Sequence, residues 1–208
     1  MQIVITILPA GESGDTRTPN LDEKFSTLKY LDRSGVEALC AADVENLRTD
    51  YESQRLEEGT YARATFLPTF AQACWHFGTE EYVAQIVRGK SPKIKGAKVD
   101  DIALYWSHDF NARKLVILRF AFLKPASDKT MSDTVALLEA AEKEAREWGF
   151  DQIVAWNPSK GIIDAAHALA KDRVEVYDRM DDSIPSLRWR GEEERSIEWN
   201  PNEKYAWC

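Results

Sequence analysis

One continuous segment, residues 115–157, constrains the fold more than any other part of the 208-residue chain. Residues 115–123 are apolar, β-branched or aromatic apart from one charge, Arg119, which predicts a strand buried on both faces. Residues 132–148 place apolar side chains at spacings of three and four, which predicts an amphipathic helix, and residues 151–157 predict a second short strand. A strand, a helix and a strand of these lengths form a right-handed βαβ crossover, so we expect an α/β sheet built around this unit.

The rest of the chain predicts further elements that pack on this crossover. Helices are expected at residues 34–55, 69–88 and 161–171, and strands at residues 2–8, 25–31, 102–108, 174–180, 186–190 and 195–199. The strand at 102–108 is joined to the central strand by a short polar turn, which predicts an antiparallel hairpin. The last three strands predict an antiparallel end to the sheet. We expect residues 1–33 to form an N-terminal strand and a mobile loop, and residues 34–208 to form one domain.

Composition excludes several classes of function. The formal net charge of −8 disfavours nucleic-acid and membrane-surface binding, because both need a basic face. No apolar run approaches the roughly 20 residues needed to cross a bilayer. The three cysteines, Cys40, Cys74 and Cys208, give neither a disulfide framework nor a zinc pattern, and His76 with Glu80 lacks further ligands, so no metal site is expected. These features predict a reduced, cytoplasmic protein that binds a small molecule.

Four side chains are candidates for catalysis. Arg119, in the middle of an apolar strand, either meets a carboxylate inside the fold or faces a cleft and binds an anionic substrate group, because an unpaired buried charge is strongly destabilising. His108 and Asp109 end a strand, where they form either a general base with its carboxylate or an exposed turn pair. Tyr177 supplies a phenol that can act as a general acid.

Aromatic and amide side chains near strand ends are candidates for substrate binding. Trp156 and Asn157 follow the second central strand, at the edge where open α/β sheets place ligands. Asn157 either orients a substrate amide or caps the next turn. The aromatic residues of the C-terminal tail either wall a pocket or pack closing strands over a sheet edge. The full set of candidate binding residues is Trp106, Trp156, Asn157, Arg179, Ser183, Ser186, Trp189 and Tyr205.

Several motifs in residues 75–208 carry a resemblance to a known family. They are Trp75-His76 with Glu80-Glu81, Lys95-Gly96-Ala97, residues 115–119, residues 144–149, Trp156-Asn157-Pro158, residues 182–189 and residues 202–208. With the order of elements, they resemble the GNAT acyltransferases, and more specifically the C-terminal half of the fungal LYC1-type lysine N-acetyltransferases. The resemblance implies a mixed, mostly antiparallel sheet with helices on both faces, which opens between its central strands to admit acyl-CoA. Those enzymes carry a further N-terminal GNAT unit, for which 208 residues leave no room.

The segment that would hold the cofactor departs from the family pattern. By resemblance, a glycine-rich loop after the central strand binds the CoA pyrophosphate through its backbone N–H groups. Here residues 124–131 contain no glycine, Pro125 has no N–H to donate, and Asp128 adds a negative charge. The remaining candidates for cofactor contact are Lys124, Lys129 and Ser132.

Two functions follow from these observations. The resemblance implies acyl transfer from acetyl-CoA to the amine of a lysine-like amino acid, by direct attack on the thioester. The degenerate loop equally favours a cleft that catalyses another reaction on an amine-bearing or amino-acid-derived metabolite, in which Arg119 holds a carboxylate or enolate and His108 or Tyr177 moves a proton. The alternative is a non-catalytic unit that pairs with a separate GNAT chain, and a homodimer is the other partnership considered.

Overall fold

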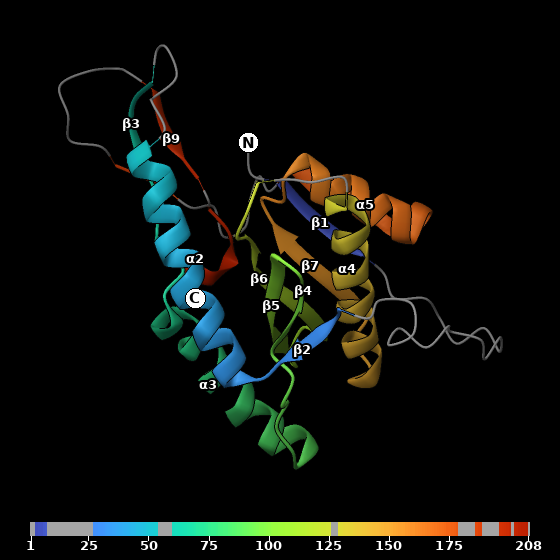
Figure 1. Cartoon of the computed structure of the whole chain (residues 1–208). Coiled ribbons are helices and arrows are strands. Elements are labelled where there is room, and N and C mark those ends of the chain that lie inside the picture. The colour runs from blue at the N-terminus through green and yellow to red at the C-terminus, as the bar shows by residue number, and fades with distance from the viewer. Residues whose placement is uncertain are drawn as a thin grey trace.

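The computed structural model describes residues 3–7, 27–53, 60–125, 129–178, 186–188, 196–200 and 202–207. Its main element is a seven-stranded sheet with the order β2-β4-β5-β6-β7-β1-β8 (Figure 1). The strands are β1 (Ile3–Ile7), β2 (Lys29–Leu31), β4 (Gly96–Val99), β5 (Ile102–Asp109), β6 (Lys114–Phe122), β7 (Gln152–Trp156) and β8 (Val174–Asp178). Only β6 and β7 run parallel, and every other pair is antiparallel, so the expected mixed, mostly antiparallel sheet is confirmed.

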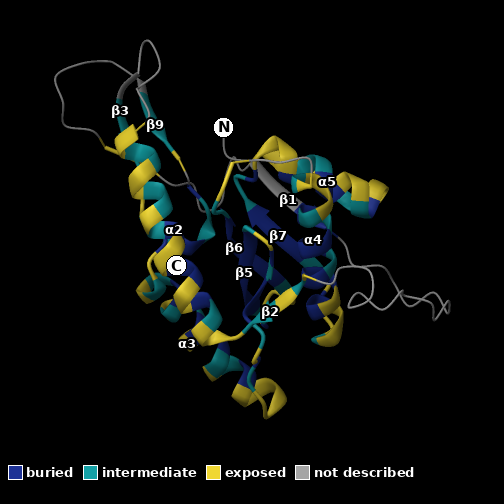
Figure 2. Ribbon diagram, in the orientation of Figure 1, coloured by how far each residue is buried: buried dark blue, intermediate teal, exposed yellow. Residues whose placement is uncertain are grey.

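Helices cover both faces of this sheet, as predicted. On one face lie α2 (Arg33–Ser53) and α3 (Phe70–Arg88), and on the other lie α4 (Thr130–Glu147) and α5 (Lys160–Ala170). Two apolar clusters lie between the helices and the sheet, and they bury most residues of the central strands (Figure 2). Among the described residues, no helix is both long and apolar enough to cross a membrane.

The predicted βαβ crossover forms the centre of the sheet. Strand β6 leads into α4 and then into β7, which lies parallel to β6. Gly149 ends the helix with a positive φ of 67°, a conformation that glycine adopts without steric penalty. The hairpin of β5 and β6 is also present, with eight aligned residue pairs between Ile102–Asp109 and Lys114–Phe122. Both predictions came from local sequence patterns and both are confirmed.

The chain ends differ from the prediction. Strand β1 lies between β7 and β8, so the N-terminal strand belongs to the interior of the main sheet. Strand β9 (Ser196–Trp199) does not close this sheet, because it pairs in parallel with β3 (Thr60–Ala64) in a separate two-stranded sheet. Residues 186–188 form no strand. The expected loop at residues 9–23 lies outside the described residues.

Candidate functional site

The two central strands separate part-way along their length. They pair only between Lys114–Ile117 of β6 and Gln152–Ala155 of β7. Beyond this point β6 continues to Phe122, whereas β7 ends at Trp156. The two strands therefore form a fork, which is the opening that the GNAT resemblance implies for the central strands.

A β-bulge lies where the fork begins. In the pairing with β5, Tyr105 faces Arg119 and Trp106 faces Ile117, so Leu118 is an extra residue on β6. A bulge bends its strand and disrupts the local hydrogen-bond ladder. Because the extra residue follows the last pair with β7, the bulge explains why β6 turns away from β7 at this position.

The C-terminal segment of the chain fills the fork. The backbone N–H of Phe120 donates to the Glu203 carboxylate at 2.8 Å. The Asn157 side-chain amide, at the end of β7, donates to the backbone carbonyl of Asn202. Further along β6, the Phe122 carbonyl accepts from the Asn46 amide of α2 at 3.1 Å. Side chains and loop residues thus replace the strand partner that this part of β6 lacks.

Arg119 is held inside the fold by two carboxylates. Its guanidinium donates two hydrogen bonds to Asp43 on α2, at 2.8 and 3.0 Å, and a third to Glu203. The residue is only 6% exposed. Of the two alternatives for Arg119, the structure has the internal ion pair. Three of its donors meet these interior acids, while contact of Arg119 with a substrate carboxylate or enolate stays a prediction.

This cluster holds one positive group against two negative ones. Burial lowers the pKa of Arg119, but the nearby carboxylates of Glu203 and Asp43 outweigh it and raise the pKa well above its usual value. Burial raises the pKa of Glu203, and its contacts with Arg119 and the Phe120 N–H offset this only in part. With both acids ionised the cluster has a formal charge of −1, so its surroundings favour a cation.

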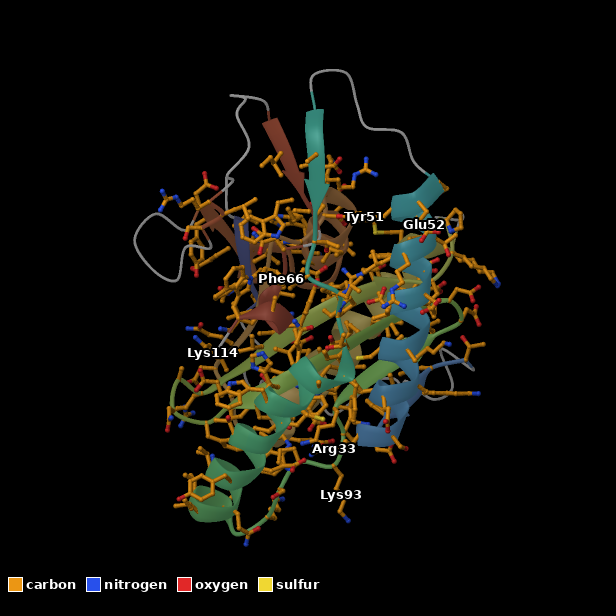
Figure 3. All side chains as sticks on the ribbon, turned by 90° about the vertical axis from the view of Figure 1, so that its left-hand side faces the viewer. Arg33, Tyr51, Glu52, Phe66, Lys93 and Lys114 are labelled. Carbon is orange, nitrogen blue, oxygen red and sulfur yellow. The ribbon has the colours of Figure 1, made fainter. Side chains whose placement is uncertain are left out.

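A cavity of about 520 Å³ lies beside the cluster, and we call it the fork cavity. It is lined by Asn46, Leu47, Asp50, Arg119, Phe120, Phe122, Asn157, Pro158, Ser159, Ile162, Asn200, Asn202 and Glu203. Asp50 has no ion pair with any described residue, so its carboxylate adds an uncompensated negative charge to the wall. The adjacent Tyr51 lies near the end of α2 (Figure 3) and fixes this wall, because its hydroxyl donates to the backbone carbonyl of Asn200.

Aromatic residues anchor the C-terminal segment in the fork. The Trp207 ring lies 5.5 Å from that of Phe66 and 5.7 Å from that of Trp199, and its indole N–H donates to the Asn202 side chain at 2.9 Å. Tyr205 is buried, and its hydroxyl donates to the Phe66 carbonyl. Burial raises the pKa of Tyr205. The tail therefore packs as structure, and Tyr205 is an anchor instead of the expected pocket wall.

His108 lies in a second buried cluster on the other side of β5. Its Nδ1 is 2.9 Å from Glu80 of α3, and its Nε2 is 2.9 Å from Glu144 of α4. Glu80 also accepts from the Lys95 ammonium. Asp109, the expected partner, instead accepts from the backbone of the following turn and does not contact the imidazole. The predicted His108–Asp109 base is therefore wrong in its partner.

The two carboxylates fix the charge of His108. Because each ring nitrogen faces a carboxylate oxygen, the imidazolium, which carries a proton on both nitrogens, is the form that satisfies both contacts. Burial lowers the pKa of His108, but the hydrogen bonds to Glu144 and Glu80 outweigh burial and raise it. The Trp148 indole N–H also donates to Glu144 at 2.9 Å. A histidine that is charged and held at both nitrogens stabilises the fold and has no free nitrogen to accept a proton.

The remaining candidates divide between the fork and other places. Asn157 lines the fork cavity, and Trp156 lies next to it with the Lys204 ammonium 4.4 Å from its ring centroid. Trp106 is fully buried in the core under α4, so it cannot contact a substrate. Tyr177 is exposed on β8, two strands from β7, and does not line the cavity.

The other predicted binding residues give no support to the site. Ser186 is exposed and does not line the fork cavity. Arg179, Ser183 and Trp189 lie outside the described residues.

Two of the expected cofactor contacts, Lys124 and Ser132, are engaged by neighbouring groups. The Lys124 ammonium lies 3.0 Å from the Asp101 carboxylate, and the Ser132 hydroxyl donates to the Lys129 carbonyl at 2.8 Å. Asp133 puts a negative charge in the first turn of α4, where a diphosphate would need positive potential. Residues 126–128 lie outside the described residues.

Comparison with known proteins decides the family. The family described as "LYC1 GNAT-like C-terminal domain" matches residues 12–208. The chain belongs to this family. Membership in the LYC1-like family confirms the resemblance carried by the motifs.

One curated relative adds a reaction name. The LYC1-like chain is 27% identical over 154 residues to the "Lysine acetyltransferase" of Yarrowia lipolytica (strain CLIB 122 / E 150). The match covers 72% of this chain and 37% of the relative, so the chain spans little more than a third of that protein's length. No solved structure shows a significant match.

Proposed function

We propose that this chain is the acceptor-binding unit of an N-acyltransferase, and that a separate GNAT unit supplies the acyl-CoA. One observation carries the proposal: the Glu203 carboxylate accepts a hydrogen bond from the backbone N–H of Phe120 inside the fork. By resemblance this opening would admit the acyl donor, but here the chain's own C-terminal segment fills it. The ion pairs with Arg119 and the aromatic anchors around Trp207 hold the segment in place.

The charge of the fork cavity supports an amine as the ligand. Asp50 and Glu203 line it together with a single cation, Arg119, which is also paired with Asp43. An ammonium group would balance the excess negative charge, and the asparagine carbonyls of the wall offer further acceptors. The volume of about 520 Å³ lies within the usual range of small-molecule sites. The name of the Yarrowia relative agrees with an amino acid that carries a second amine.

The position of the titratable groups favours binding over catalysis. His108 is held at both nitrogens in a separate cluster, and Tyr177 lies away from the cavity. The described part of the loop after β6 disfavours a diphosphate. These features favour the non-catalytic alternative over a cleft adapted to a different reaction.

Calorimetry with lysine and with acetyl-CoA tests the proposal. We expect lysine to bind and acetyl-CoA to give no heat. Asp50→Asn removes a carboxylate from the cavity wall, and a lost charged hydrogen bond of about 1.5–3 kcal/mol lowers the affinity for lysine roughly tenfold or more. Glu52→Gln is the matched control, because Glu52 is an exposed acid two residues away that does not line the cavity (Figure 3).

Two results would refute this function. Acetyl-CoA that binds the isolated chain tightly would show that the fork opens for the donor. Acetylation of lysine by the isolated chain, followed by mass spectrometry, would show that no second unit is needed. The proposal instead predicts acetyl-lysine only when a GNAT chain with an intact glycine-rich loop is added.

A further inference from the structure

A second cavity, of about 270 Å³, lies between α3 and the hairpin of β5 and β6, and we call it the hairpin cavity. None of the described residues that line it also lines the fork cavity, so it is a separate site. It is smaller than most small-molecule sites, which suits a ligand of only a few heavy atoms. Its wall combines buried polar groups with apolar side chains.

A buried serine hydroxyl lies at this cavity without a hydrogen-bond partner. Ser107 is only 8% exposed and lines the cavity together with Val116, its pairing partner on β6. Among the described residues, none forms a hydrogen bond with the Ser107 hydroxyl. A buried hydroxyl normally has a partner in the protein or in a bound molecule. The Ser107 hydroxyl therefore indicates that a ligand occupies the cavity.

His76 offers a second group to the same ligand. Its Nε2 lies 3.4 Å from the Tyr205 carbonyl, which can only accept, so Nε2 carries the ring proton. Burial and the Lys204 ammonium lower the pKa of His76, so the ring is neutral at pH 7 and its Nδ1 carries no proton. A negatively charged ligand would reverse this preference, and Nδ1 would then become a hydrogen-bond donor.

The two acids of the cavity wall are neutralised by groups of the fold. Both Glu80 oxygens are engaged, one with the Lys95 ammonium and the other with the imidazole of His108. The Asp109 carboxylate accepts from the backbone of the following turn at 2.9 Å and lies 3.9 Å from the Lys114 ammonium. Neither acid therefore requires a cation from a ligand.

Lys204 gives the cavity a positive charge. Its ammonium lies 4.4 Å from the centroid of the Trp156 ring, and its charge acts on His76 more strongly than that of Glu80 does. A carboxylate in the cavity would meet this ammonium, the Ser107 hydroxyl and, after proton uptake, Nδ1 of His76. Part of the wall is apolar and suits a short alkyl chain, since it is formed by Val83, Phe110 and Val116.

We propose that the hairpin cavity binds a short-chain carboxylate, which accepts hydrogen bonds from Ser107 and from protonated His76 and is balanced by Lys204. Binding takes up one proton from solvent, and this proton stays on Nδ1 of His76. No described residue of the fork cavity takes part, so the site does not depend on the proposed function.

Butyrate is the probe, and the His76 resonance reports its binding. In a proton NMR titration, sodium butyrate is expected to raise the pKa of His76 by about 1–3, because a bound carboxylate stabilises the imidazolium. Sodium chloride at the same ionic strength is expected to leave this pKa unchanged. The resonance is assigned by its loss in His76→Asn. Acetate, which lacks two CH₂ groups, is expected to bind about tenfold more weakly than butyrate.

Ser107→Ala separates a role in binding from a role in the fold. The substitution removes a buried hydroxyl that no described residue satisfies, so the thermal unfolding midpoint is expected to stay the same or rise. The affinity for butyrate is expected to fall roughly tenfold, because a hydrogen bond to a charged group is lost.

Lys204→Met is also expected to weaken butyrate binding, and Lys160→Met is its matched control. Lys160 is an exposed lysine that lines neither cavity. The proposal is overturned if butyrate changes the pKa of His76 no more than chloride does, or if Ser107→Ala binds butyrate like the wild type or is less stable. It is also overturned if Lys204→Met binds butyrate as tightly as Lys160→Met.

Discussion

Replacing Arg119 by methionine is expected to destabilise the fold more than removing either of its acidic partners. Methionine fills much of the same space without the charge, so Asp43 and Glu203 remain buried with no cation between them. Breaking a buried ion pair by removing one partner costs about 3–5 kcal/mol, because the other charge stays behind. A domain of this size is stabilised by only about 5–15 kcal/mol, so Arg119→Met removes a large share of the free energy of unfolding.

The acidic partners provide the comparison. Asp43→Asn and Glu203→Gln each leave the guanidinium with one carboxylate, so the cluster becomes neutral and keeps most of its hydrogen bonds. We expect each to lower the free energy of unfolding by only about 1–3 kcal/mol, the usual penalty for an imperfectly satisfied buried group. Adding Glu203→Gln to Arg119→Met is expected to recover part of the loss, since one of the two unpaired carboxylates disappears.

Urea unfolding followed by tryptophan fluorescence measures these differences. The Arg119→Met variant is also expected to become more stable as the pH falls, because burial raises the pKa of Glu203 and no cation then offsets this, so Glu203 binds a proton more readily in the folded state. The reasoning is refuted if Arg119→Met costs less than Glu203→Gln, or if the double variant is no more stable than Arg119→Met alone.

Three further predictions concern other parts of the fold. In a proton NMR titration the pKa of His108 should lie above 6.5 and that of His76 below it. The stability that His108 contributes is therefore present below pH 6.5 and is lost as the pH rises through its folded pKa. The reverse order of the two pKa values would contradict the imidazolium assignment. Gly96→Ala should lower the thermal unfolding midpoint, because its Cβ would lie 2.4 Å from the Leu104 carbonyl; an unchanged midpoint would show that β4 can shift. Trp207 is only partly buried, so Trp207→Ala should cost about 1–3 kcal/mol and expose the fork to proteolysis, whereas intact resistance would show that the tail holds without its aromatic anchor.

The sequence predicted those features that depend on neighbouring residues. The period of α4, the apolar run of β6 and the short turn before it were sufficient for the crossover and the hairpin at the centre of the sheet. The missing glycine in the loop after β6 likewise followed from the residues alone. These features are local, because a helical period or a tight turn is set by residues a few positions apart.

The site required contacts between distant residues. An arginine in an apolar strand predicted that a carboxylate would be near, but Asp43 and Glu203 lie 76 and 84 positions away along the chain. Nothing in their own surroundings distinguishes them from the other acids of the chain. Glu80 and Glu144, the partners of His108, were missed for the same reason, and the adjacent Asp109 was chosen because it was near in sequence.

The sequence by itself determined the crossover, the hairpin and the family. The tertiary structure decided where the chain ends go: β1 enters the sheet between β7 and β8, and the segment at Asn202–Ala206 fills the fork. The unpaired backbone N–H and C=O groups of a strand can form hydrogen bonds with any segment that offers suitable donors and acceptors. Packing across the whole domain selects which segment does so. A bulge at Leu118 creates the fork, but only the folded chain shows that an acid from its own C-terminal segment occupies it.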